Sequence, residues 1–204
     1  MSSNAAPTLS ADEALQRLKA GNERFLAGTA KFPTVQKEIL ADLAKGQHPY
    51  ATILSCSDSR VPPELIFDAG FGELFIIRVA GNVVSPEIAG SLQYAGRHLR
   101  TPLFVVLGHT GCGAIGAAID TKLHGTRQHS RIQLLVDSIL PGLANLDPQL
   151  ASEAMLAQGV EANVRWSMRQ ILETPEGRER QAEGVMKLVG AIYEIETGRV
   201  RFLE

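Results

Sequence analysis

Residues 50–60 (YATILSCSDSR) and residues 103–113 (LFVVLGHTGCG) share one pattern, in which an apolar run of strand length ends in a polar cluster. Short apolar runs of this kind are typical of buried strands. The only two cysteines of the chain, Cys56 and Cys112, stand in these polar clusters, and His109 stands beside Cys112. Because ligands of open parallel sheets bind beyond the carboxyl ends of the strands, the two stretches predict neighbouring strands and a site where they end.

The remaining apolar runs extend this sheet. A third strand is predicted from Glu73 to Val79, and Ser85-Pro86-Glu87 predicts a helix start, with a capping serine and proline at the first helical position. Residues 185–195 and 199–203 predict a C-terminal hairpin around a turn at Glu196-Thr197-Gly198. Strands that alternate with helices predict an α/β fold with a central, mostly parallel β-sheet flanked by helices on both faces.

Two helical regions flank this core within one predicted domain, residues 1–204. Residues 1–45 predict an N-terminal helical arm, in which Ser10 and Glu13 match a capping box and a second short helix begins at Pro33-Thr34. Residues 128–182 predict a helical insertion, and three proline-containing breaks divide it, at Pro141-Gly142, Asp147-Pro148 and Thr174-Pro175.

Composition excludes several classes of function. The net charge is −2, and the 20 lysines and arginines are scattered, so the chain lacks the basic patch of a nucleic-acid-binding protein. No apolar run approaches the length of a membrane span, and the first residues lack the features of a secretion signal. The glycine-rich segment 108–116 lacks the ending of a phosphate-binding loop. We therefore expect a cytoplasmic, soluble protein without nucleic-acid or membrane partners.

The residue types of the two clusters indicate zinc. In a reducing compartment two cysteines are more often thiols or metal ligands than a disulfide, although a pair of buried structural thiols is the alternative. Thiolate and imidazole suit Zn²⁺, and the ligand set Cys56, His109 and Cys112 leaves a fourth position for water, substrate or the Asp58 carboxylate. Arg60 can hold Asp58 aside by bidentate pairing, whereas the simpler alternative is a surface ion pair.

The segments Cys56-Ser57-Asp58-Ser59-Arg60 and His109-Thr110-Gly111-Cys112-Gly113 together resemble the paired signature of the β-class carbonic anhydrases. The resemblance extends from about Asn22 to the C-terminus. It implies a twisted parallel sheet, a helical arm wrapped around a partner subunit, and a homodimer or homotetramer. The implied reaction is the reversible hydration of CO2 to bicarbonate and a proton.

The resemblance also implies residue roles. Cys56, His109 and Cys112 become the ligands of one Zn²⁺ per chain. Asp58 orients the zinc-bound hydroxide, or replaces it as fourth ligand in a closed state, and Arg60 holds Asp58. For substrate binding, the resemblance implies that the Gln47 amide contacts a substrate oxygen and that Phe75 lines the CO2 pocket. The simpler interpretations are that Gln47 is a polar loop residue and that Phe75 is a core aromatic residue.

Departures from the family pattern bear on details. The segment Arg78-Val79-Ala80-Gly81-Asn82 differs from the commoner Arg-Asn-Val-Ala-Asn in the wall of the CO2 pocket. Ile53 occupies the position of a tryptophan that completes an inhibitory bicarbonate site in some members, and the only tryptophan here is Trp166. Four histidines outside the motif are candidate proton shuttles, although a surface histidine usually has no special role: His48, His98, His124 and His129.

Two other functions use the same residues. Hydrolysis of carbonyl sulfide or carbon disulfide requires the same ligands, and the motif does not separate these substrates from CO2. A zinc-stabilised binding module without catalysis requires a permanently closed site with Asp58 as fourth ligand. Arg60 disfavours that module, because a structural ligand needs no partner that pulls it away from the metal.

Overall fold

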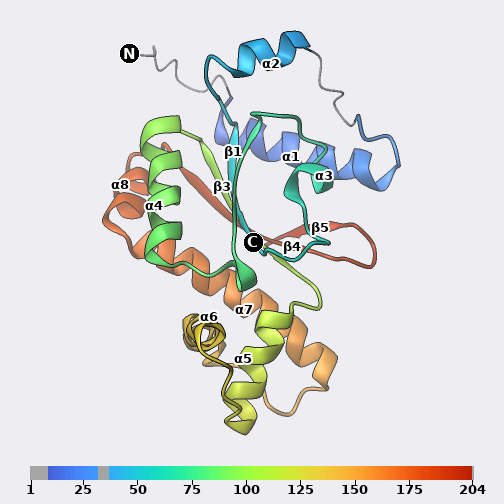
Figure 1. Cartoon of the computed structure of the whole chain (residues 1–204), viewed down its shortest axis with the longest axis vertical. Coiled ribbons are helices and arrows are strands. Elements are labelled where there is room, and N and C mark those ends of the chain that lie inside the picture. The colour runs from blue at the N-terminus through green and yellow to red at the C-terminus, as the bar shows by residue number, and fades with distance from the viewer. Residues whose placement is uncertain (1–8, 32–36, 204) are drawn as a thin grey trace.

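The computed structural model describes residues 9–31 and 37–203, in which five strands form one sheet in the order β2-β1-β3-β4-β5 (Figure 1). Three of the four strand pairings are parallel, and the fourth, between β4 and β5, is antiparallel and forms the predicted hairpin. The α/β class with a mostly parallel sheet is thus confirmed. The strands are β1 (Ala51–Ser55), β2 (Leu74–Arg78), β3 (Leu103–His109), β4 (Lys187–Tyr193) and β5 (Val200–Phe202).

The register places the polar clusters at one edge. Ser55, the last residue of β1, pairs with Arg78 on β2 and with Leu107 on β3. Strand β3 continues two residues beyond the apolar run of residues 103–107, so His109 is its last residue and pairs with Tyr193. The residues that follow β1 and β3 therefore leave the sheet side by side, which is the condition for a shared site.

Helices cover both faces of the sheet, and alternating strand residues point into two cores. Ile53 and Val105 pack against α1 and α3 on one face, whereas Leu54 and Val106 belong to the core under α4 to α7 on the other. In Figure 1, α5 and α6 extend past the lower end of the sheet. The helices are α1 (Ala11–Leu26), α2 (Lys37–Leu43), α3 (Pro63–Ile66), α4 (Pro86–Tyr94), α5 (Gly113–His124), α6 (Arg131–Ile139), α7 (Ser152–Glu173) and α8 (Pro175–Ala182).

Helix α1 begins with the predicted capping box. The Ser10 hydroxyl accepts a hydrogen bond from the Glu13 amide, and the Glu13 carboxylate accepts one from the Ser10 amide. The helix then buries Ala14 and Leu18 completely against the sheet of its own chain, where Asn22 donates to the Gly198 carbonyl and accepts from the Val200 amide. The apolar face of α1 is thus covered by its own chain, and the packing of the helical arm on a partner subunit stays a prediction.

The helices between residues 128 and 182 break where the prolines predict. Pro141-Gly142 lies in a 3₁₀ turn (Leu140–Leu143), Pro148 lies between this turn and α7, and Thr174 ends α7 and caps α8 by accepting from the Gly177 amide. The predicted start of the second helix at Pro33-Thr34 lies outside the described residues. No helix in the described ranges is long and apolar enough to cross a membrane.

The helix after Ser85 changes its winding before it ends. Leu92 and Ala95 are buried on one face of this helix, and residues Ala95–Leu99 form a π-helical turn in place of regular α-helix. Arg100 ends this turn in the left-handed conformation at φ 54°. A π turn is rare and often marks a functional region, so the end of this helix carries side chains that a regular helix would place differently.

Candidate metal centre

Three buried side chains meet at the carboxyl edge of the sheet. One potential ligand atom from each of Cys56, His109 and Cys112 lies within 4.8 Å of the others. Exposure is 5% for Cys56, 0% for His109 and 2% for Cys112. Among residues 9–31 and 37–203, no other group of three such side chains is brought together. The structure therefore joins the two polar clusters that stand 53 positions apart in sequence.

Local structure positions each of these side chains. Cys56 follows β1 directly, and His109 is the last residue of β3. Cys112 is the N-cap residue of α5, where free backbone amides at the helix start favour negative charge. Gly111 makes the turn from strand to helix at φ 65°, a conformation that glycine adopts without strain.

The protonation states of the two thiols differ. A hydrogen bond from Cys112, with further help from His109 and the Gly81 amide, lowers the pKa of Cys56 to about 4 despite burial. That same interaction with Cys56, together with burial, raises the pKa of Cys112. Burial opposes the charged form of His109, but the nearby Cys56 thiolate and the hydrogen bond to the Thr110 carbonyl outweigh it and raise the pKa of His109. Cys56 and Cys112 together therefore carry a single negative charge, and a metal cation that binds both sulfurs replaces the proton between them.

These residues fit a zinc ion. Zinc bound at about 2.3 Å to sulfur and about 2.0–2.1 Å to nitrogen in a tetrahedron places donor atoms roughly 3.5–3.8 Å apart, in keeping with the compact group. His109 Nδ1 lies 2.8 Å from the Thr110 carbonyl, which leaves Nε2 as the free ring nitrogen. This Nε2 is buried and has no hydrogen-bond partner. A buried polar atom without a partner is costly, and a metal ion at this position would satisfy it.

Asp58 stands beside this group and is held by Arg60. Arg60 donates from its amide and from Nε to Asp58 Oδ1, at 3.0 and 2.9 Å, and from a terminal nitrogen to Oδ2 at 2.8 Å. Asp58 Oδ2 lies 3.9 Å from His109 Nε2. These bonds to Arg60 hold the pKa of Asp58 well below its usual range, so the carboxylate stays ionised and faces the metal position while remaining tied to the arginine.

Contacts from more distant parts of the chain hold the Cys56 loop. Arg78, at the end of β2, donates to the carbonyl oxygens of Cys56 at 2.9 Å and of Asp58 at 2.5 Å. The Gly81 amide donates to Cys56 Sγ at 3.4 Å, and Asn163 from α7 donates to the Gly81 carbonyl at 2.8 Å. The sequence reasoning missed Asn163, a residue 1% exposed, for which the only signal was an amide on an apolar helix face.

Comparison with known proteins identifies this arrangement. The family model for carbonic anhydrase matches residues 51–200, which is most of the chain. Carbonic anhydrase 2 of Mycobacterium tuberculosis is 37% identical over 188 residues, covering 91% of this chain and 89% of the relative. The chain belongs to the β-class carbonic anhydrases. The carbonic anhydrase of Synechococcus elongatus is 31% identical, with 84% of this chain and 66% of that protein covered.

Solved structures of other members share the fold of this carbonic anhydrase. The beta-carbonic anhydrase CcaA aligns with a TM-score of 0.74 and 28% identity, over 93% of this chain and 87% of that one. A tetrameric beta-carbonic anhydrase from Sordaria macrospora aligns with a TM-score of 0.75 and 25% identity, over 90% and 93% of the two chains. The resemblance seen in the two cysteine motifs therefore extends to the whole sheet and its helices.

Gln47 and Phe75 do not join the metal centre of their own chain in this carbonic anhydrase. Gln47 precedes β1 and Cys56 follows it, so about 16 Å of strand separates them. Gln47 instead lines a pocket with Tyr94 and His98, and the Tyr94 ring lies 6.0 Å from Phe75. Tyr94 was missed from the sequence, although a tyrosine 45% exposed and four residues before a histidine on one helix is a detectable signal.

The other residues singled out from the sequence lie away from the centre. Ile53 is fully buried in the core under α1, and Trp166 donates from Nε1 to the Ser138 carbonyl at 3.0 Å, where it joins α7 to α6. No tryptophan therefore lies next to Cys56. The four candidate proton-shuttle histidines are all exposed, and none belongs to the metal-binding group: His48, His98, His124 and His129.

Proposed function

We propose that this carbonic anhydrase binds one Zn²⁺ per chain through Cys56, His109 and Cys112, and that it catalyses the reversible hydration of CO2 to bicarbonate and a proton. The observation that carries the proposal is the buried His109 Nε2, without a partner, beside two buried sulfurs. When bound, zinc lowers the pKa of a water ligand enough to make hydroxide available near neutral pH.

The residues around the ion supply position and charge. Cys56 and Cys112 would bind the ion as thiolates, whose two negative charges balance the two positive charges of Zn²⁺, and His109 would bind as a neutral imidazole. Asp58, ionised and tied to Arg60, accepts a hydrogen bond from the reacting water and so fixes its orientation. Arg60 also keeps the carboxylate away from the ion, which supports an open fourth position over the closed arrangement that a non-catalytic zinc module requires.

The alternative substrates are carbonyl sulfide and carbon disulfide, which are linear like CO2. Measuring kcat/KM for all three on one zinc-quantified sample separates them. The proposal expects CO2 to be the preferred substrate, and a higher kcat/KM for either sulfur compound would assign the enzyme to that substrate instead. Two free, buried thiols also support a reducing location such as the cytoplasm, since oxidation to a disulfide would remove two ligands.

The enzyme is proposed to work as a homodimer or homotetramer. Gln47 precedes β1, whereas the metal centre follows it, and Phe75 pairs with Thr52 near the start of β1 and lies beside Tyr94. A substrate role for these three residues therefore requires the centre of a second copy. The related Sordaria macrospora enzyme is described as tetrameric. We expect sedimentation to give a dimer or larger species at assay concentrations, and a fully active monomer would contradict this assignment.

Zinc binding should release protons, and the metal should therefore be lost toward acid. The pKa of Cys112 is raised, so this thiol is protonated at neutral pH and releases its proton when it binds zinc. The pKa of His109 is also raised, so a fraction of the His109 side chains releases a proton as well. Cys56, with a pKa of about 4, is already a thiolate above pH 6 and therefore releases few protons when zinc binds. Calorimetry in buffers of different ionisation enthalpy should give between about one and two protons released per zinc at pH 7. A value near zero would contradict the protonation states.

A further inference from the structure

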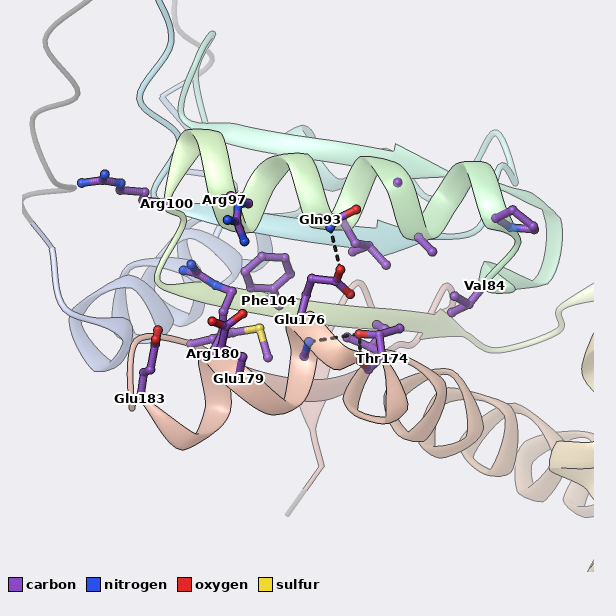
Figure 2. A pocket seen from close by; sticks show the side chains of 18 residues that line it. Val84, Gln93, Arg97, Arg100, Phe104, Thr174, Glu176, Glu179, Arg180 and Glu183 are labelled. Carbon is purple, nitrogen blue, oxygen red and sulfur yellow. Dashed lines mark hydrogen bonds between the residues drawn. The ribbon is translucent and has the colours of Figure 1, made fainter.

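A second cavity lies between α4, its π turn and α8 (Figure 2), and neither Tyr94 nor His98 lines it. Its volume is about 450 Å³, within the range of small-molecule sites. None of Cys56, His109 and Cys112 lines it, so it is separate from the metal centre. Leu92, Phe104, Ile171 and Met186 give it an apolar lining.

An arginine without a partner enters this cavity from α8. Arg180 lies across Gly96, so close that a Cβ at residue 96 would stand 3.1 Å from Arg180 Nε. That Nε is buried and has no hydrogen-bond partner. Burial lowers the pKa of Arg180, and the nearby Arg100 acts in the same direction against Glu183 and Glu179. A guanidinium that is partly desolvated and unpaired is costly, and an anion would remove that cost.

Two more guanidinium groups line the cavity. Arg97 stands on the π turn and Arg100 directly follows it. In Figure 2, Arg97 and Arg180 reach into the space beside Phe104 from opposite helices, whereas Arg100 points outward. Within the described part of the chain, neither Arg97 nor Arg180 has a hydrogen bond or ion pair. A guanidinium fork binds a carboxylate through two parallel hydrogen bonds, so a carboxylate placed in this space suits either arginine.

The acidic residues of the cavity limit the charge of a ligand. Glu176 is occupied, because Gln93 donates to its carboxylate at 2.7 Å. Glu179 on α8 and Glu183, directly after α8, are exposed and, with Glu176, balance the charge of the three arginines. These carboxylates would repel a ligand with several negative charges more strongly than a ligand whose single negative group lies between Arg97 and Arg180.

We propose that this cavity binds a small organic monocarboxylate with an apolar body. Its carboxylate group lies between Arg97 and Arg180, and its apolar part lies against Phe104 and Met186. The proposal is independent of the reaction at the metal centre, because it rests on other residues and its test does not depend on CO2 hydration.

Methionine-methyl NMR of the zinc-loaded enzyme tests this proposal. The chain has four methionines, of which Met186 lines the cavity while Met155 and Met168 do not. Benzoate should shift the Met186 methyl signal saturably and leave the signals of Met155 and Met168 in place, which also separates this site from carboxylate binding at zinc. Benzyl alcohol, with the same ring and no charge, should bind at least about tenfold more weakly.

Variants identify the group that binds. Arg180→Gln should weaken benzoate binding at least about tenfold, whereas Arg178→Gln, the same change at an exposed position of α8 outside the cavity, should not. If Arg180→Gln fails to fold, judged by the Met155 and Met168 signals, exposed Arg97→Gln replaces it with the same expectation. Equal binding of benzyl alcohol, unchanged affinity in the arginine variant, or no saturable Met186 shift would each overturn the proposal.

Discussion

Replacing Cys112 with alanine should remove zinc from the enzyme and lower CO2 hydration below about 1% of the wild-type rate. The substitution deletes one of only three protein ligands and leaves Cys56 and His109 with an incomplete site. Changes in the residues around zinc ligands alone cost about 10–100-fold in metal affinity, and loss of a ligand should exceed that range. Metal analysis after dialysis, together with stopped-flow CO2 hydration, measures both effects.

Two controls separate ligand loss from unfolding. His109→Ala should behave like Cys112→Ala, whereas His124→Ala changes an exposed histidine at the end of α5 and should retain one zinc per chain. Circular dichroism should show an unchanged α/β spectrum in all three variants. Full zinc content in a folded Cys112→Ala or Cys56→Ala protein would refute the ligand assignment.

Replacing Arg60 with alanine should lower CO2 hydration by about 100-fold while zinc stays in place, because misplacing a reacting group by about 1 Å can cost this much. The variant loses the two hydrogen bonds that the Arg60 side chain donates, and Asp58 keeps only the bond from the backbone amide of residue 60. The carboxylate is then free to turn toward the ion and close the fourth position. Asp58→Ala should lose similar activity for a different reason, since no carboxylate then orients the reacting water. Stopped-flow assays on zinc-quantified variants measure both.

Conservative changes sharpen this test. Arg60→Lys should restore only part of the activity, because lysine lacks the planar fork that contacts both oxygens of Asp58. Arg127→Ala, at an exposed position outside the site, is the matched control and should retain wild-type activity. Near-normal turnover in either Arg60→Ala or Asp58→Ala would contradict the assigned roles.

Local sequence patterns correctly predicted the helices and strands that short stretches of sequence determine. The strand interiors were predicted correctly because both faces of a parallel sheet are buried, which makes runs such as residues 103–107 continuously apolar. Strand ends were less accurate, since the bonds to a neighbouring strand decide where pairing stops. His109 proved to belong to β3 because it pairs with Tyr193 on β4, a strand far away in sequence.

Long-range contacts are what the sequence did not reveal. Asn163 bonds a carbonyl 82 residues earlier, and Arg78 bonds the Cys56 loop 22 residues earlier, and no local pattern marks either pairing. The π turn at Ala95–Leu99 was missed because its residues have ordinary helical periodicity. For α1, an amphipathic pattern indicates an apolar face without identifying the surface that covers it, and that surface proved to be its own sheet.

The most direct test of the central claim is the rate of CO2 hydration as a function of zinc content. Enzyme stripped with a chelator and reloaded to known occupancy should show no activity without metal and a rate that rises in proportion to zinc, with a plateau at one zinc per chain. A rate independent of zinc content, or full occupancy of one zinc per chain without CO2 hydration, would contradict the claim that Cys56, His109 and Cys112 form a catalytic zinc site.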